Sequence, residues 1–460
     1  MKKLLILLIT LSIISCQEKE KPIDYAIFSG KIDNLTSGKL SITKDKKNIK
    51  EIDIHEDGTF KDTLKNIENG YHTFRYNKEI STFYLEPGYN LNLTLDTKQF
   101  DESIKYSGKG SIENNYLAQK FLKEEKTGEV ITFPYLGGLD EKQYVHVIDS
   151  IKQLSLNLLK EQKDISPNLK TLEKASIVYG AALKLNQFEQ LKQYFSKNKD
   201  FKKSDEFPDF ESELNLEDEN LIQNNIYRQY LSAHYSGIAA KKSKKDGTDF
   251  ATTYIETIAD EVKSPKIKEF LLFQIADNTI SYTKDLQNFY DLFMANSSSE
   301  DNKKTITEKY NKLIKLGKGR PSPKFVDYEN YKGGTMSLDD LKGKFIYVDV
   351  WATWCGPCKG EIPFLKKMEK EYHDKNIVFI SMSIDKKADH EKWKTMVKEE
   401  NLTGVQLFAP NDWKSKFVTD YGIRGIPRFI LIDPEGNIVD SNAPRPSSPD
   451  LKKLFDELKI

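Results

Sequence analysis

Short runs in which hydrophobic and polar residues alternate fill residues 24–110. Leu91, Leu93 and Leu95, for example, are separated by polar residues, which is typical of a strand with one buried face. The turn dipeptide Asp57-Gly58 separates two such runs. Several short strands at close spacing predict a small antiparallel β domain here, a sandwich or a barrel.

Through residues 111–318, hydrophobic residues recur at intervals of three and four, which predicts helices. The dipeptides Ser166-Pro167 and Ser264-Pro265 each suit an N-cap followed by proline in the first helical turn. Helical patterns continue behind them over 172–195 and 267–280. The middle region is therefore predicted to be all-helical, and it shows no clear internal repeat.

Strand-like and helical patterns alternate from residue 319 to the end, over 319–460. A linker rich in glycine and proline, 319–323, marks the start of this region. The runs 345–350, 377–383 and 428–433 are mostly apolar and have helical patterns between them. This order predicts a central sheet covered by helices, so the chain is multidomain, with a C-terminal α/β domain.

The start of the chain has the pattern of an export signal. A positively charged start precedes an apolar run over residues 4–14, which as a helix would span about 16 Å, against about 30 Å for a bilayer core. Residues 1–15 are therefore predicted to be a signal peptide, and 16–23 a polar tether. The end of the signal resembles the lipobox of bacterial lipoproteins, and that resemblance implies a diacylglycerol thioether on Cys16.

Charge and cysteine content narrow the function. Lysine and arginine together number 70, as do aspartate and glutamate, so no net field would attract nucleic acid, and no such partner is expected. The six histidines lack metal-ligand spacing, and the three cysteines include only one close pair, Cys355 and Cys358. No metal site is predicted, and a single close pair in an exported chain indicates redox activity.

The cysteine pair lies in residues 351–359, which read WATWCGPCK, where a predicted strand ends and a helix begins. Cys355 would therefore lie at a helix N-terminus, where free N–H groups and the helix dipole favour a thiolate. Gly356 and Pro357 separate the cysteines, so that Cys358 can reach Cys355 within one turn. The motif predicts that the two sulfurs exchange thiols and disulfides.

This motif and residues 421–427, which read YGIRGIP, resemble the thioredoxin superfamily. The resemblance implies a thioredoxin fold for the C-terminal domain. It also implies a cis-proline at Pro427 that faces the disulfide, and backbone groups of Ile426 that an extended partner can bind. The implied substrate groove consists of Trp354, Gly356, Pro357, Ile426 and Pro427.

Residues 359–363, which read KGEIP, are similar to the TlpA/ResA-like membrane-tethered oxidoreductases, which carry glutamate at this place. The resemblance implies that Cys355 attacks a client disulfide and that Cys358 resolves the mixed disulfide. Asp349 is expected to accept the proton of Cys358, and Glu361 to tune the pair or relay a proton. Two alternatives stay open: Asp349 is a hydrogen-bonded residue at a strand end, and Glu361 is an exposed helix charge.

The leading hypothesis is an exported, membrane-anchored thiol-disulfide oxidoreductase that reduces disulfides of exported proteins. The Gly-Pro dipeptide of the motif resembles that of thioredoxin, which is reducing at about −270 mV. The expected partners are exported proteins with disulfides or dithiols and an electron-donor protein in the membrane, with no cofactor besides the Cys355–Cys358 pair. Gln17, the second residue of the mature chain, resembles the outer-membrane address of Gram-negative lipoproteins, and the glutamate-rich tether resembles surface-export tethers of the Bacteroidetes group. These resemblances imply a lipid-anchored protein of the cell envelope, facing the periplasm or on the surface, with the outer membrane favoured.

Two alternatives remain at this point. In one, residues 24–318 capture a ligand or partner and the redox domain is accessory, so that the chain is a binding lipoprotein. In the other, the chain is a thiol peroxidase, although peroxiredoxins carry a threonine before a single peroxidatic cysteine.

Overall fold

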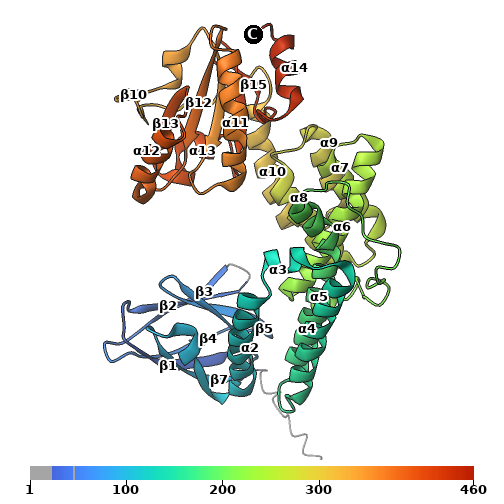
Figure 1. The fold of residues 1–460 in the computed structure, drawn as a ribbon. Coiled ribbons are helices and arrows are strands. Elements are labelled where there is room, and N and C mark those ends of the chain that lie inside the picture. The colour runs from blue at the N-terminus through green and yellow to red at the C-terminus, as the bar shows by residue number, and fades with distance from the viewer. Residues whose placement is uncertain (1–22, 45–46) are drawn as a thin grey trace, which may run out of the picture. The chain divides into compact units, whose positions relative to one another are not determined.

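A computed structural model describes residues 23–44 and 47–460 of the chain (Figure 1). The predicted signal peptide and lipidation site lie outside the described residues. Tertiary contacts divide the chain into two compact units, one that ends at Leu231 and one that begins at Ser232. This division falls within a helix, so the region predicted to be helical, 111–318, contributes to both units.

The first unit begins with a β region whose strands form two four-stranded sheets. These strands are β1 (Ala26–Asp33), β2 (Lys39–Lys44), β3 (Lys47–Asp53), β4 (Thr59–Leu64), β5 (Gly70–Tyr76), β6 (Glu79–Leu85), β7 (Asn90–Asp96) and β8 (Lys105–Lys109). The sheets are ordered β4-β1-β7-β8 and β3-β2-β5-β6. The ring of Phe28 joins their cores, since it stacks on Phe83 of the second sheet at 5.0 Å and lies 5.3 Å from Phe60 of its own.

One strand pair departs from the antiparallel pattern that the sequence predicted. Strands β1 and β7 run parallel, with Phe28 opposite Leu91. A parallel pair requires a long connection between its strands, and strands β2 to β6 supply that connection. The three alternating leucines of β7 are buried, as their spacing predicted.

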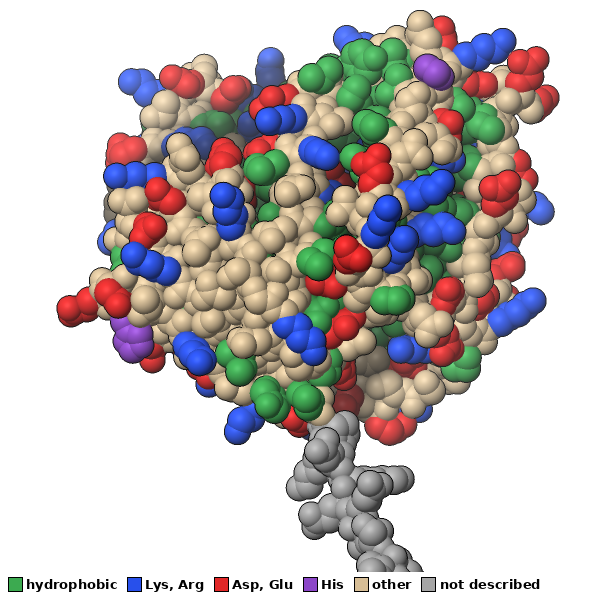
Figure 2. Space-filling model, turned by 90° about the horizontal axis from the view of Figure 1, so that it is seen from below, with side chains coloured by type: hydrophobic (Ala, Val, Ile, Leu, Met, Phe, Trp, Pro, Cys, Tyr) green, Lys and Arg blue, Asp and Glu red, His purple; other side chains and the backbone are tan. Residues whose placement is uncertain are grey.

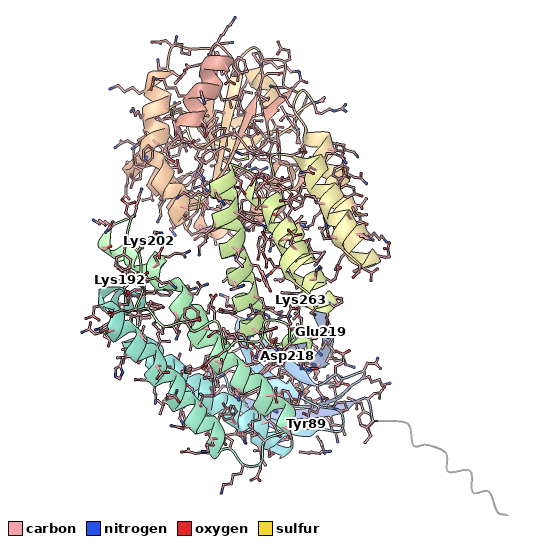
Figure 3. All side chains as sticks on the ribbon, turned by 90° about the vertical axis from the view of Figure 1, so that its right-hand side faces the viewer. Tyr89, Lys192, Lys202, Asp218, Glu219 and Lys263 are labelled. Atoms are coloured by element: carbon pink, nitrogen blue, oxygen red, sulfur yellow. A yellow bond between two sulfur atoms is a disulfide. The ribbon has the colours of Figure 1, made fainter. Side chains whose placement is uncertain are left out.

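Helices follow the sheets in the first unit. They are α1 (Phe100–Ser103), α2 (Ser111–Val130), α3 (Phe133–Gly138), α4 (Glu141–Glu161), α5 (Pro167–Ser196), the 3-10 turn η1 (Glu219–Leu221) and α6 (Asn225–Asp246), which crosses the unit boundary. The N-cap predicted at Ser166 is confirmed, since its hydroxyl accepts a hydrogen bond from the N–H of Leu169. Lys192 of α5, labelled in Figure 3, donates to the carbonyls of Gly137 and Leu139 and so ties α5 to the end of α3.

Two consecutive asparagines of α2 connect the helix to an outer strand of each sheet. Asn114 accepts from the N–H of Tyr84 in β6 at 2.7 Å and donates to its carbonyl at 2.9 Å. Asn115 does the same with Tyr106 in β8, at 2.8 and 2.9 Å. The start of α2 therefore satisfies backbone groups that outer strands would otherwise leave without a partner.

The second unit continues with α7 (Phe250–Glu261), α8 (Pro265–Thr279), α9 (Leu286–Asn296), α10 (Glu300–Leu313) and the 3-10 turn η2 (Ile314–Leu316). The N-cap predicted at Ser264 is confirmed by the hydrogen bond that it accepts from the N–H of Ile267. The predicted linker is paired along its length, because the N–H of Gly319 donates to Ile438 and that of Ser322 to Gly436. The linker backbone thus supplies hydrogen-bond partners to Ile438, which lies in an outer strand of the C-terminal sheet.

A seven-stranded sheet organises the C-terminal region. Its strands are β9 (Tyr328–Asn330), β10 (Thr335–Met336), β11 (Phe345–Trp351), β12 (Ile377–Ser383), β13 (Val405–Phe408), β14 (Arg428–Ile432) and β15 (Ile438–Asp440). The order is β10-β9-β13-β12-β11-β14-β15. Strands β11, β12 and β13 are parallel, and β14 is antiparallel to β11.

Helices cover both faces of this sheet: α11 (Gly356–Glu371), α12 (His390–Glu399), α13 (Lys416–Asp420) and α14 (Pro449–Glu457). Helices α11 and α14 pack on the face that carries Tyr347. Helices α12 and α13 pack on the opposite face, which carries Val348 and Val350. This is the thioredoxin-like α/β fold that the resemblance implied, beside the β region and the helical region.

The visible face of the molecule in Figure 2 shows basic and acidic side chains interspersed, consistent with their equal numbers. Over residues 23–44 and 47–460, no helix has the length and apolar character needed to cross a bilayer.

We expect Asn114→Ala to lower the free energy of unfolding of the first unit by about 2–3 kcal/mol, because it leaves buried backbone groups of Tyr84 without a partner. Urea titrations followed by circular dichroism measure this loss. Tryptophan fluorescence follows the second unit separately, because all four tryptophans lie there. The control Asn92→Ala, which removes only longer hydrogen bonds between side chains, should cost less than about 1 kcal/mol. Equal losses in both variants would contradict the prediction.

A candidate redox-active site

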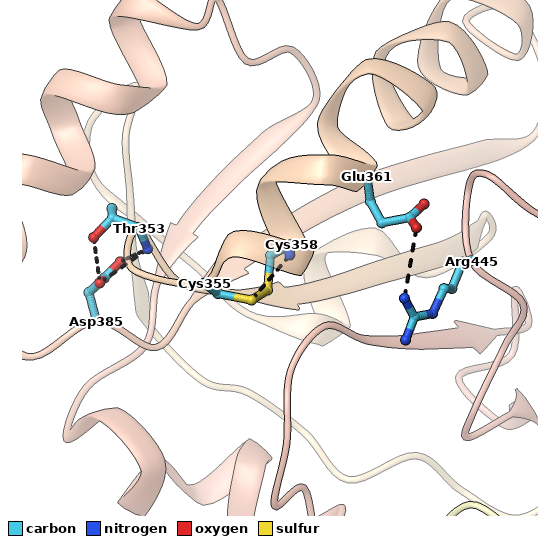
Figure 4. Close-up of a disulfide and its surroundings, with 6 residues drawn as sticks. All are labelled: Thr353, Cys355, Cys358, Glu361, Asp385 and Arg445. Atoms are coloured by element: carbon cyan, nitrogen blue, oxygen red, sulfur yellow. Dashed lines mark hydrogen bonds and ion pairs between the residues drawn. A yellow bond between two sulfur atoms is a disulfide. The ribbon is translucent and has the colours of Figure 1, made fainter. Parts of the chain in front are cut away.

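The two cysteines of the motif form a disulfide at the start of α11 (Figure 4). Strand β11 ends at Trp351, and Cys355 is the N-cap of the helix, as the sequence predicted. The Cys355 sulfur accepts a hydrogen bond from the N–H of Cys358 at 3.1 Å. In the reduced state this N–H and the helix dipole would stabilise a Cys355 thiolate, which is the nucleophilic form.

The peptide bond between Ile426 and Pro427 is cis, as the resemblance implied. The bond lies in the loop between α13 and β14. In the pairing of β14 with β11, Arg428 lies opposite Val350, so the loop comes next to the segment that carries the disulfide. The fold thus brings together the two segments that the sequence placed in one groove.

A buried aspartate that the sequence analysis missed anchors the active-site loop. Asp385 accepts hydrogen bonds from the N–H and the hydroxyl of Thr353, the latter at 2.8 Å, and from the hydroxyl of Ser383 at 2.8 Å. Asp385 is fully buried and follows β12 by two residues. An acidic residue directly after a buried strand, at the same end of the sheet as the motif, was the signal that could have found it.

The remaining residues of the predicted groove differ in exposure. Trp354 is half exposed, with 51% of its surface accessible, and its ring lies 6.3 Å from that of Trp413, which the sequence analysis did not single out. A side chain built on Gly356 would meet no atom within 4 Å. Pro357 occupies the first turn of α11. Cys355 thus follows an exposed aromatic side chain, Trp354, and precedes a glycine with open space around it, Gly356. The part of these residues in client binding stays a prediction.

Asp349 lies in the middle of β11 and is buried. Its Oδ1 atom has no hydrogen-bond partner among the described residues, which contradicts the alternative of a bonded residue at a strand end. Burial raises the pKa of its carboxyl to about 8, and the negative charges of Glu361 and Glu369 add to this shift. Asp349 therefore gains and loses a proton in the pH range in which thiols react.

A cavity of about 10 Å³, close to the minimum room for one water molecule, is lined by Asp349, Trp351 and Gln406 together with residues of α11. The indole nitrogen of Trp351 and Oε1 of Gln406 also lack partners within the described part of the chain. The Trp351 side chain is itself buried.

Glu361 points away from the disulfide, toward Arg445 (Figure 4). It accepts hydrogen bonds from the N–H and the hydroxyl of Ser447 at 3.0 and 2.9 Å, and its carboxylate lies 3.9 Å from Arg445. The alternative of an exposed helix charge is therefore wrong, because the side chain of Glu361 is buried against the segment that carries Arg445 and Ser447. Its charge acts on the pKa of Asp349, and its part in the redox reaction stays a prediction.

Across the described ranges, no group of three or more histidine, cysteine, aspartate or glutamate side chains is placed to hold a metal ion.

The C-terminal region is similar to a known protein family and to characterised oxidoreductases. Residues 317–458 match the Redoxin family model. The thiol-disulfide oxidoreductase ResA of Bacillus thuringiensis (strain Al Hakam) is 29% identical over 129 residues, which cover 27% of this chain and 69% of that protein. ResA of Bacillus subtilis (strain 168) is 29% identical over 126 residues, which cover 27% and 66%.

Solved structures are also similar to this region. The thioredoxin domain of a thiol-disulfide oxidoreductase from Bacteroides vulgatus is 31% identical and aligns with 31% of this chain and 98% of its own, with a TM-score of 0.28. A thiol-disulfide oxidoreductase from Bacteroides fragilis NCTC 9343 is 27% identical and aligns with 30% and 99%, also with a TM-score of 0.28.

We expect Asp349→Asn to stabilise the protein at pH 9 by a few kcal/mol, on the order of the energy of a pKa shift of this size. The unfolded chain loses the Asp349 proton near pH 4, whereas the folded protein keeps it until about pH 8. The proton on Asp349 contributes its full stability below about pH 4, and this contribution is lost as the pH rises to about 8. The stabilisation by Asp349→Asn should therefore be largest at pH 9 and should shrink toward pH 4. Urea titrations followed by tryptophan fluorescence measure it.

The expected role of Asp349 as the proton acceptor of Cys358 predicts that the same variant slows the attack of Cys358 on a mixed disulfide; stopped-flow kinetics measure this rate. Asp374→Asn, which changes an exposed carboxylate, is the control and should change stability by less than about 0.5 kcal/mol at either pH. A gain of equal size at pH 4 and pH 9 would show that the buried charge is not its cause.

Proposed function

We propose that the chain reduces disulfides of exported proteins through Cys355 and Cys358. Two findings support this proposal: residues 317–458 form a redoxin domain of the TlpA/ResA-like thioredoxin family, and the chain is a thiol-disulfide oxidoreductase. The observation that carries the proposal is the hydrogen bond from the Cys358 N–H to the Cys355 sulfur at the N-terminus of α11. It favours Cys355 as the attacking thiolate.

The reaction transfers two electrons from the cysteine pair to the client. The Cys355 thiolate attacks one sulfur of the client disulfide, forms a mixed disulfide and releases the first client thiolate. Cys358 gives its proton to Asp349 and attacks the Cys355 sulfur, which releases the second client thiolate. The products are a reduced client and the Cys355–Cys358 disulfide that the structure contains. An electron-donor protein in the membrane would then reduce this disulfide for the next cycle.

The site of action follows from the start of the chain, which lies outside the described residues. We propose that Cys16 is lipidated and that 16–23 tether the protein to the cell envelope, with the outer membrane favoured by Gln17. Metabolic labelling with an alkyne fatty acid tests this, since Cys16→Ser should abolish the label.

A cavity in the first unit supports a second candidate function, the binding of a small polar ligand. It measures about 540 Å³ and is lined in part by Tyr71, Lys120 and Glu173. The buried Glu173 accepts hydrogen bonds from the Tyr71 hydroxyl at 2.5 Å and from the Lys120 ammonium at 2.8 Å. Ligand binding that persists in the double variant Cys355→Ser, Cys358→Ser would show that this function is separate from the redox reaction.

A redox titration of the full chain carrying Cys16→Ser tests the proposed direction, because Cys355 and Cys358 are then the only thiols. We expect a two-electron midpoint near that of thioredoxin, about −270 mV. Cys355→Ser should abolish reduction of a protein disulfide, whereas Cys358→Ser should accumulate a mixed disulfide, visible by mass spectrometry. A midpoint near about −120 mV would identify an oxidant instead, and the absence of any reversible transition would contradict an oxidoreductase.

A further inference from the structure

The turn that follows α8 contacts the cis-proline loop on both sides of Pro427. Before the proline, a Cβ built on Gly425 would lie 3.1 Å from the Tyr282 hydroxyl, so the tyrosine lies close against the loop backbone. After the proline, the guanidinium of Arg428 lies 5.0 Å from the centre of the Tyr282 ring. Both partners belong to the second unit, although the sequence separates them by more than a hundred residues.

Arg428 bonds the cis-proline loop to the turn after α8. Its side chain is buried, and it donates hydrogen bonds to the carbonyl of Ser281 at 3.2 Å and to that of Ser441 at 2.9 Å. Burying a guanidinium is costly unless its donors and its charge have partners. The helical region supplies two of these partners, the Ser281 carbonyl and the face of the Tyr282 ring.

A second contact holds the same loop to α8. Arg424 forms an ion pair with Asp277 of α8 at 3.3 Å, and Asp277 also pairs with Lys309 of α10. The residues around this pair line a cavity of about 250 Å³ between α8, α10 and α13. The loop with the cis-proline is therefore held by the helical region at Arg424 and again at Arg428.

Apolar surface remains exposed around these contacts. Tyr282 keeps 37% of its surface accessible, and Trp354, directly before Cys355, keeps 51%. Ile426, directly before the cis-proline, is half-buried. A polypeptide segment laid along the loop would thus meet an aromatic ring from the motif and another from the helical region.

We propose that the Ser281–Tyr282 turn forms one wall of the client groove and selects extended protein segments with an apolar side chain next to the cysteine. The inference rests on the proposed function, since it names the clients of the same disulfide. It assigns Tyr282 as a specificity-determining residue and gives the helical region a part in client choice. We therefore expect a low-molecular-weight disulfide to react with Cys355 without contacting this wall.

The test compares a protein disulfide with a small one, using the full chain carrying Cys16→Ser. Insulin is the protein probe, and 5,5′-dithiobis(2-nitrobenzoate) is the small probe. Tyr282→Ala should raise the KM for insulin about fivefold or more with kcat changed less than twofold, so that the ratio of kcat/KM for insulin to that for the small disulfide falls at least fivefold. Tyr282→Phe, which keeps the ring, should preserve the ratio.

Tyr194→Ala is the matched control, because Tyr194 is 77% exposed and lies in the first unit. An unchanged ratio in Tyr282→Ala, or an equal loss with both probes, would overturn the inference while leaving the proposed function intact. If the unsubstituted chain reduces neither probe, the proposed function itself fails.

A second measurement does not depend on the stability of a Tyr282 variant. In Cys358→Ser, a peptide with one cysteine between leucines can be trapped as a mixed disulfide with Cys355. Hydrogen exchange of residues 281–285 should slow at least threefold in this complex, relative to the same protein joined to glutathione. Equal exchange in the two complexes would overturn the inference.

Discussion

The structure depends on one constraint, which is that a strand must end and a helix begin within four residues so that Cys355 lies at the helix N-terminus. Each neighbouring element helps to hold this turn. The end of β12 anchors it through Asp385 and Thr353, and β14 brings the cis-proline beside it through its pairing with β11. The turn after α8 then holds the proline loop from outside the sheet. The chemistry of two sulfurs is thus supported by contacts from distant parts of the second unit.

Negative charge is favoured at the start of α11 and disfavoured in the middle of β11. The dipole of α11 favours negative charge at the Cys355 sulfur, whereas burial disfavours negative charge on Asp349. Glu361 and Glu369 strengthen this effect, and Glu361 keeps its own place through Ser447 and Arg445. Above about pH 4, a buried carboxyl with a raised pKa lowers the free energy of unfolding, and such carboxyls are common at functional sites.

The sequence could predict the features that depend on residues adjacent in the chain. The motif, the N-caps at Ser166 and Ser264 and the apolar strands depend on neighbours in the chain, and the structure contains them. The features that were missed depend on residues far apart in the sequence. Asp385 binds Thr353 across the sheet, and Tyr282 contacts the proline loop from another region. The parallel pairing of β1 with β7 was missed for the same reason, because strand alternation carries no information about direction.

The asparagine pair of α2 has a consequence for how the first unit can associate with other chains. Sheets polymerise or capture peptides when an outer strand offers free N–H and carbonyl groups to an added strand. Asn114 and Asn115 occupy those groups at Tyr84 of β6 and Tyr106 of β8. Strand addition is thereby blocked at one edge of each sheet. A partner that extends either sheet would have to bind at β3 or β4, the outer strands at the other end.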